Sequence, residues 1–88
     1  MRRINYDNLK NKNIKIIDVQ EKYEFKTSHI EGSINIPYDE LMNNYKNYLN
    51  KNDLYYITCK KGHLSKRAVS ILEYLGYNVV MLEKTSSK

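Results

Sequence analysis

The chain has 88 residues, 41% of them hydrophobic and 28% charged, which suits a small globular domain rather than a disordered or fibrous protein. No apolar run is long enough to cross a membrane, and the basic start of the chain lacks the apolar core of a signal peptide. We therefore expect a single cytoplasmic domain over residues 1–88, with a frayed tail at 84–88.

The chain is basic, with a formal net charge of +5. Scattered lysines most simply keep a protein soluble, and an anionic partner is the sharper interpretation. No recognised nucleic-acid motif accompanies the charge, so we expect neither a nucleic acid nor a membrane as partner. Cys59 is the only cysteine, and His29 and His63 do not cluster with it as zinc ligands. We therefore expect no metal and no cofactor.

The first half of the chain predicts two strands and two helices. Residues 14–19 are β-branched and nearly continuous, which is typical of a strand covered on both faces. A short helix over residues 21–27 and a short strand over residues 33–36 follow, the strand bounded by Gly32 and Pro37. Apolar residues at helical spacing then predict a helix over residues 39–49.

The second half predicts a strand over residues 54–58, a helix over 65–75 and a strand over 79–82. Ser65 can cap the start of this helix, and Gly76 suits the left-handed position after its end. Strands that alternate with helices indicate an α/β fold with a central, mostly parallel sheet flanked by helices.

Cys59 directly follows the strand predicted over residues 54–58. Functional sites of open α/β sheets lie at the carboxyl ends of the strands. The loop and the start of the next helix direct backbone N–H groups toward one point, which favours an anion and therefore a thiolate. Lys60 and Lys61 either strengthen this positive environment or point into solvent.

Two segments carry a family resemblance. Residues 18–21 read D-V-Q-E, residues 24–25 read E-F and residues 29–37 read H-I-E-G-S-I-N-I-P, while residues 59–65 read C-K-K-G-H-L-S. In this order and spacing they resemble the rhodanese family of sulfurtransferases, with its Asp-Val-Arg-Glu, Glu-Phe, His-Ile-x-Gly-Ala-x-Asn-Ile-Pro and Cys-x-x-Gly-x-Arg-Ser motifs. The resemblance extends over nearly the whole chain and implies a rhodanese-like fold.

The resemblance also implies a reaction. Cys59 would be the nucleophile that takes a sulfane sulfur from thiosulfate or a protein persulfide and passes it to a thiophilic acceptor. The implied partners are an anionic sulfur donor and a sulfur-relay protein. The implied active loop consists of Lys60, Lys61, Gly62, His63, Leu64 and Ser65. Asp18 is expected to support this face through hydrogen bonds, and Arg67 to assist from the helix.

Three positions depart from the family pattern. Leu64 replaces the arginine before the loop serine, which weakens the expected binding of an oxyanion donor; Lys66 and Arg67 are candidates to compensate. Gln20 replaces the arginine of Asp-Val-Arg, which removes a salt bridge. Family members often continue with Gly-Gly and another helix after the last strand, whereas this chain has E-K-T. An uncovered apolar face would favour a homodimer or a partner protein over a monomer.

Other interpretations stay open. Cys59 can be a buried core residue, and the domain can be a weakly active or inactive binding module that uses the same face. His63 either orients a substrate or is an ordinary loop residue, and His29 is expected to stabilise a turn. A phosphatase needs an arginine six positions after its cysteine, where this chain has Ser65, so that function is not expected.

Overall fold

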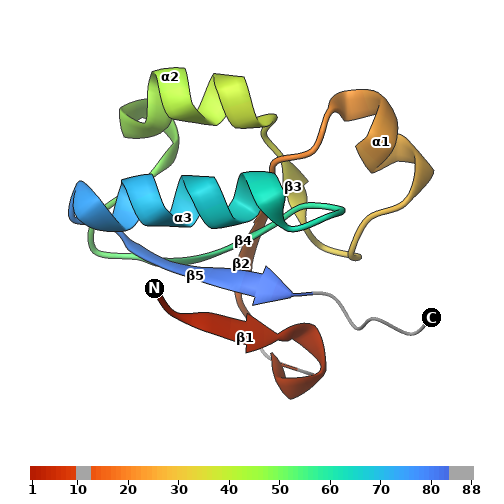
Figure 1. Ribbon diagram of the computed structural model, residues 1–88, viewed down its shortest axis with the longest axis horizontal. Helices are drawn as coiled ribbons and strands as arrows, with labels where there is room; N and C mark the ends of the chain where they lie inside the picture. Colours follow the sequence, from red (N-terminus) through yellow and green to blue (C-terminus); the bar gives the residue numbers. More distant parts are fainter. Residues whose placement is uncertain (10–12, 84–88) are drawn as a thin grey trace.

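The computed structural model describes residues 1–9 and 13–83 and is built around one parallel sheet (Figure 1). Its five strands lie in the order β1-β5-β4-β2-β3, and every neighbouring pair is parallel. The strands are β1 (Arg3–Asn5), β2 (Lys15–Asp18), β3 (Ile34–Asn35), β4 (Leu54–Thr58) and β5 (Asn78–Glu83). The predicted α/β fold is confirmed.

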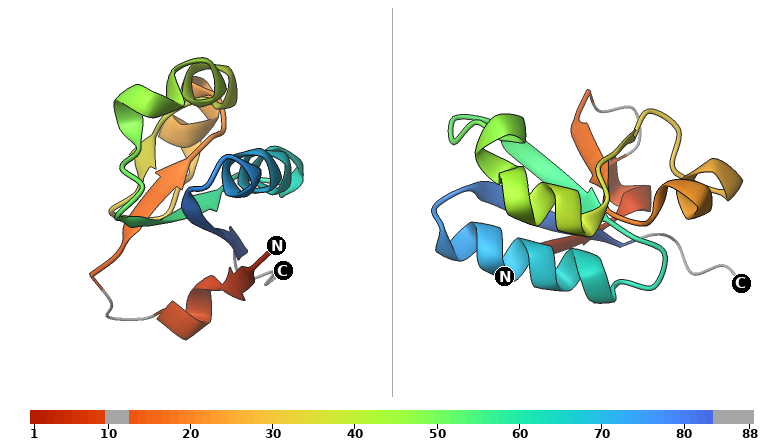
Figure 2. Two further views of the ribbon diagram at one scale, coloured as in Figure 1. Left: turned by 90° about the vertical axis from the view of Figure 1, so that its left-hand side faces the viewer. Right: turned by 90° about the horizontal axis from the view of Figure 1, so that it is seen from above.

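Two helices cover one face of the sheet, as Figure 2 shows. They are α2 (Tyr38–Tyr48) and α3 (His63–Tyr74); α3 packs on β4 and β5, and the apolar side of α2 joins the same core. Leu41 of α2 and Leu72 of α3 are both 0% exposed in this core, together with Ile57 and Val79 of the sheet. This packing holds the carboxyl end of β4 and the amino end of α3 in fixed positions.

The short helix α1 (Lys22–Thr27) lies beyond the carboxyl end of β2. A capping box starts it: the Glu21 N–H donates to Glu24 Oε1 at 3.0 Å, and the Glu21 side chain accepts from the Glu24 backbone. At the end of this segment His29 stacks on Phe25, with ring centroids 3.7 Å apart, and its Nδ1 contacts the Phe25 carbonyl. These contacts hold the His29 ring against α1, and its role in stabilising a turn stays a prediction.

The opposite face of the sheet carries the N-terminal segment. β1 adds to the edge of β5, and the 3-10 helix η1 (Tyr6–Leu9) follows it and buries Leu9 against Ile16 and Leu82. Neither β1 nor η1 was predicted from the sequence. The pairing places Arg3 beside Met81 in the sheet, which matters for the site.

Helix α3 corrects one prediction and confirms another. It begins at His63 rather than at residue 65, and its N-cap is Gly62, so Ser65 does not cap it with its side chain. Its end is as predicted: Gly76 has φ +97°, and the N–H of Tyr77 donates to the Leu72 carbonyl at 3.0 Å.

The other predicted elements differ from the structure by at most one residue at either end, and the strand over residues 54–58 matches at both ends. The predicted frayed tail at 84–88 lies outside the described residues. Within residues 1–9 and 13–83, no helix is both long and apolar enough to cross a membrane.

Candidate active site

Cys59 follows the last residue of β4 and is 7% exposed. Its Sγ accepts hydrogen bonds from the backbone N–H groups of Gly62 at 3.1 Å and of Ser65 at 3.2 Å. The loop thus curls around the sulfur, so the N–H groups that lack helical partners at the start of α3 face it. Such donors stabilise a negative charge on that atom.

The loop geometry depends on Gly62 and Ser65. Gly62 has φ +85°, a left-handed conformation that favours glycine, and it turns the chain directly into α3. The Ser65 hydroxyl lies 3.4 Å from Cys59 Sγ and donates to the Gly62 carbonyl at 3.2 Å. Ser65 is 1% exposed, so its hydroxyl is buried inside the loop, where it links the first turn of α3 to Gly62.

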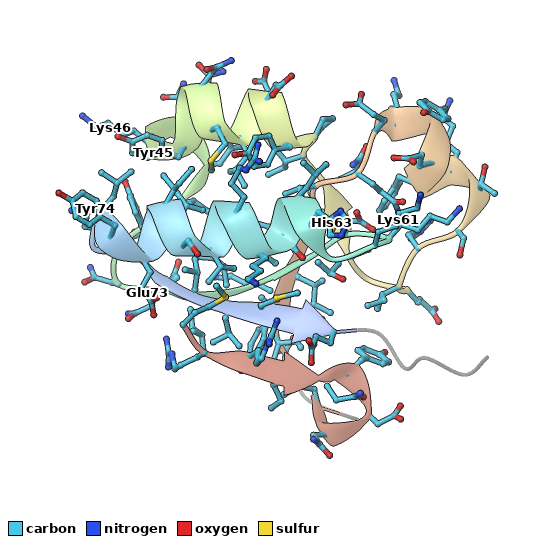
Figure 3. All side chains as sticks on the ribbon, in the orientation of Figure 1. Tyr45, Lys46, Lys61, His63, Glu73 and Tyr74 are labelled. Carbon is cyan, nitrogen blue, oxygen red and sulfur yellow. The ribbon has the colours of Figure 1, made fainter. Side chains whose placement is uncertain are left out.

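A pocket of about 550 Å³ opens on one side of Cys59. It is lined by Arg3, Cys59, Lys60, Lys61, Gly62, His63, Lys66, Met81, Leu82 and Glu83. Figure 3 labels His63 at the start of α3 and Lys61 in the loop before it, and both line this pocket. Four of the lining residues are lysine or arginine and one is glutamate, so the pocket attracts anions.

A smaller pocket of about 270 Å³ lies on the other side of Cys59, toward α1. It is lined by Gln20, Glu24, Cys59, Lys60, Lys61, His63 and Leu64. Leu64 is half-buried and packs against the core cluster that contains Cys59. At the position where the family has an arginine, this chain therefore presents an apolar side chain to the pocket. Lys60, Lys61 and His63 line both pockets and stand at the boundary between them.

Asp18 and Gln20 form a buried framework behind the loop. Asp18 is 0% exposed and accepts from the Gln20 N–H at 3.0 Å through Oδ1 and from Gln20 Nε2 at 2.9 Å through Oδ2. The same Gln20 amide donates to the Ser28 carbonyl at 3.0 Å. Gln20 therefore joins β2 to the end of α1 in place of the arginine salt bridge.

The framework leaves one group unpaired. Gln20 Oε1 is buried and has no hydrogen-bond partner among the described residues. An unpaired buried carbonyl is costly, so this position is held less favourably than a fully bonded side chain would be. The sequence identified the substitution at Gln20 but not its new bonds, which depend on the fold.

The site brings the predicted loop together but not every predicted residue. Arg67 is exposed on α3 and is not among the residues that line either pocket beside Cys59, whereas its neighbour Lys66 lines the larger one. Sequence reasoning missed Arg3, because the strand that carries it was not predicted, and it placed Met81 in a strand without giving it a role in the site. The sequence contains the basic pair Arg2-Arg3, but no sequence pattern near it indicates that it lies beside Cys59 in the fold.

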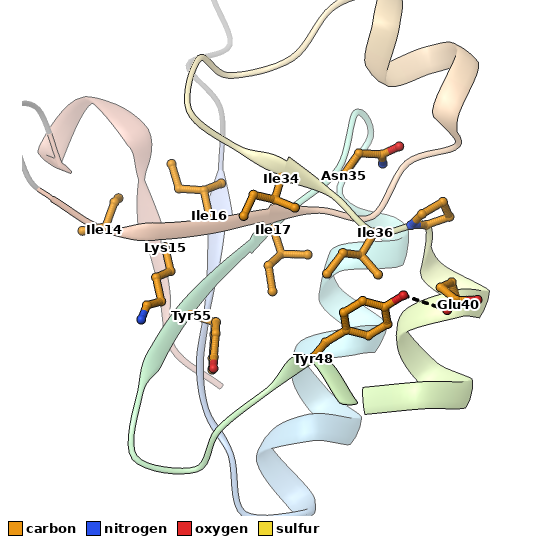
Figure 4. Close-up of a pocket in the computed structure, with 11 residues that line it drawn as sticks. Ile14, Lys15, Ile16, Ile17, Ile34, Asn35, Ile36, Glu40, Tyr48 and Tyr55 are labelled. Atoms are coloured by element: carbon orange, nitrogen blue, oxygen red, sulfur yellow. Dashed lines mark hydrogen bonds between the residues drawn. The ribbon is translucent and has the colours of Figure 1, made fainter. Parts of the chain in front are cut away.

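A further cavity, of about 540 Å³, lies away from the cysteine (Figure 4). Isoleucines of β2, β3 and the segments beside them form its walls, and Tyr48 of α2 hydrogen-bonds Glu40 at its rim at 2.7 Å. Cys59 does not line it. Among the described residues, no three His, Cys, Asp or Glu side chains gather as metal ligands.

Comparison with known proteins decides the family. The family model of the rhodanese-like domain matches residues 3–86. The chain belongs to the rhodanese-like domain family. It is 34% identical over 65 residues to the thiosulfate sulfurtransferase PspE of Escherichia coli (strain K12), covering 73% of this chain and 62% of PspE. A crystal structure of the protein SSP1007 from Staphylococcus saprophyticus superposes with a TM-score of 0.84 at 35% identity, covering 94% of this chain and 87% of that one.

Another relative is YrkF of Bacillus subtilis (strain 168), provisionally named a sulfur carrier protein, with 35% identity over 68 residues. The match covers 77% of this chain but 36% of YrkF. The chain thus spans less than two thirds of either curated relative. One of these relatives is named a sulfurtransferase and the other a sulfur carrier.

Proposed function

We propose that the protein transfers a sulfane sulfur through a persulfide on Cys59. The observation that carries this proposal is the pair of N–H groups, from Gly62 and Ser65, aimed at Cys59 Sγ at 3.1 and 3.2 Å. Donors fixed around one sulfur, in a pocket rich in lysine and arginine, suit a nucleophile that carries negative charge before and after the reaction.

In the first step the Cys59 thiolate attacks the outer sulfur of the donor. A bond forms between Sγ and that sulfur, the donor's own sulfur–sulfur bond breaks, and its electron pair leaves with the departing group, which is sulfite when the donor is thiosulfate. The thiol proton has gone to solvent beforehand. The enzyme is left as an anionic Cys59 persulfide, stabilised by the loop N–H groups and by the charge of Lys60 and Lys61.

In the second step an acceptor thiolate, or cyanide in an assay, attacks the outer sulfur of the persulfide. The new bond to the acceptor forms as the Cys59 sulfur–sulfur bond breaks, which restores the Cys59 thiolate. The two steps need no external oxidant or reductant, because the sulfane sulfur passes from the donor to the acceptor and the two electrons of its broken bond stay with the departing group. No metal or organic cofactor is required by this sequence of steps.

The donor is proposed to be either thiosulfate or a protein persulfide. Likeness to PspE, named a thiosulfate sulfurtransferase, favours the first, and likeness to YrkF favours the second. Leu64 adds an apolar wall where the family arginine would bind an oxyanion, and this favours loading from a protein. The apolar wall also favours the alternative, a weakly active module that docks a partner on this face.

The test is the intact mass of the purified protein after incubation with thiosulfate, and separately with a cysteine desulfurase and cysteine. We expect a gain of one sulfur atom that a reductant reverses and that Cys59→Ser abolishes. Loading by the desulfurase alone would assign a sulfur carrier. An unchanged mass with both donors, in a protein shown to be folded by circular dichroism, would reject sulfur transfer and leave the binding module.

A further inference from the structure

We propose that Arg3, on the N-terminal strand, binds the anionic end of the sulfur donor in place of the arginine that the loop lacks at Leu64. This rests on the sulfur transfer proposed above and names a residue outside the active loop for it. The first observation is that Arg3 lines the larger pocket beside Cys59 although 56 positions separate the two residues in the chain.

The sheet explains how Arg3 reaches the pocket. In the parallel pairing of β1 with β5, Arg3 lies opposite Met81, so both side chains point to the same face of the sheet. Met81 is on the face of Cys59, where it belongs to the same core cluster, and its Cε lies 3.4 Å from the position of a Cβ on Gly62. Arg3 Nη2 contacts Met81 Sδ at 3.5 Å. The guanidinium is therefore separated from the active loop by one methionine side chain.

The guanidinium is available to a ligand. Arg3 Nε lies 3.4 Å from Glu83 Oε2, and the two side chains are 51% and 41% exposed. An ion pair this open to water is weak, so an oxyanion in the pocket can replace Glu83 at little cost. Arginine presents two parallel N–H groups to an oxyanion, which the lysines of this pocket cannot do.

The arrangement also sets the direction of the donor. Leu64 faces the smaller pocket toward α1, whereas Arg3 lines the larger pocket over β5. The larger pocket, with Lys66 beside it and a volume of about 550 Å³, exceeds what a small inorganic donor fills. We therefore expect the anionic group of the donor, whether sulfonate, carboxylate or phosphate, to lie over β5 and β1 while its sulfane sulfur meets Cys59 Sγ.

The experiment separates anion binding from sulfur transfer. Cys59 is alkylated with iodoacetate, which is anionic, and with iodoacetamide, which is neutral, and the ratio of the two rates is measured at low and high salt. In Arg3→Gln we expect the ratio of the iodoacetate rate to the iodoacetamide rate to fall about threefold to fivefold at low salt. A fall of this size is expected when one positive charge is lost whose attraction for the anion is partly screened by solvent and salt. Loading by thiosulfate is expected to slow by a similar factor.

Two matched variants control for charge and for the ion pair. Arg2→Gln removes the same charge one residue away, at a side chain that does not line the Cys59 pocket, and should leave the ratio unchanged. Glu83→Gln frees the guanidinium and should raise the ratio. Equal ratios for Arg3→Gln and wild type would overturn the role of Arg3. Failure of thiosulfate loading in every variant, with the alkylation ratio still lowered by Arg3→Gln, would instead reject the proposed donor and keep the anion site.

Discussion

Two cavities of nearly equal volume, about 540 and 550 Å³, lie on different parts of this molecule and differ in their chemistry. The first, shown in Figure 4, is walled mainly by isoleucines of β2 and β3 and by α2. The second lies where β4 ends and α3 begins and holds Cys59 among lysines and an arginine. Cavity size alone therefore does not identify the site.

The difference follows from the direction of the strands. In a parallel sheet every strand presents its carboxyl end at the same edge, where loops lead into helices and leave N–H groups unpaired. The Cys59 pocket lies at that edge, and the loop donates two of these N–H groups to the sulfur. The isoleucine cavity instead lies along β2 and β3 and beside α2, away from the end of β4, and its walls offer mainly side-chain carbon.

The largest effect should come from the glycine that shapes the loop. Gly62→Ala places a Cβ on a residue with φ +85°, which costs about 1–2 kcal/mol of folding free energy and moves the N–H away from Cys59 Sγ. Losing one such donor slows reactions at developing anions about a hundredfold, so we expect persulfide loading to slow by roughly tenfold to a hundredfold. Loading rates by intact mass and urea unfolding measure the two effects.

Gly76→Ala is the matched control, because Gly76 has φ +97° at the other end of the same helix. A Cβ there meets the flexible end of Lys51 at 3.3 Å, so the stability cost should be similar. Loading should stay at the wild-type rate. If both variants lost loading equally, the loss would come from a weakened helix and not from the loop donor.

Most of the fold was predictable because its signals are local. The strand over residues 54–58, the apolar face of α3 and the terminating Gly76 each follow from short patterns, and the structure confirms them. The motif around residues 59–65 likewise placed the loop at the end of a strand. The start of α3 was wrong by two residues, since the cap is a left-handed glycine rather than the side chain of Ser65.

β1 was missed for a physical reason. It has three residues, of which Ile4 alone is apolar, and its partner strand begins more than seventy positions later in the chain. Such a short edge strand shows no alternation of apolar and polar residues from which a strand could be predicted. Arg3 therefore stayed out of the predicted site, and the bonds of Gln20 to Asp18 and Ser28 stayed hidden because they join segments that only the fold brings together.

A smaller effect on loading is expected from placing an arginine at position 64, where the family pattern has one. Leu64→Arg would place a guanidinium on the α1 side of Cys59 and should speed loading by thiosulfate about threefold to tenfold at low salt, by attracting the dianion. Leu64→Gln is the control, since it removes the same packing without adding charge. Equal rates for the two variants would mean that added charge in the smaller pocket does not draw thiosulfate to Cys59.

The smallest expected effect is a change in folding stability, and it concerns Tyr48 beside the isoleucine cavity. The hydrogen bond from the Tyr48 hydroxyl to Glu40, with minor help from burial and from the Glu40 charge, raises the pKa of Tyr48 above 10.0. The folded protein then holds the phenol proton more tightly than the unfolded chain does. The resulting stabilisation is present below pH 10.0 and is lost as the pH rises through the folded pKa.

Tyr48→Phe should therefore lower the urea midpoint slightly at neutral pH, and the gap to wild type should close in alkaline solution above pH 10.0. Tyr74→Phe, at a tyrosine that is 89% exposed, is the control and should not change the midpoint. Persulfide loading of Tyr48→Phe should match wild type, because the cavity that it borders does not reach Cys59. A clear loss of loading in this variant would connect the two cavities and make the isoleucine cavity part of the site.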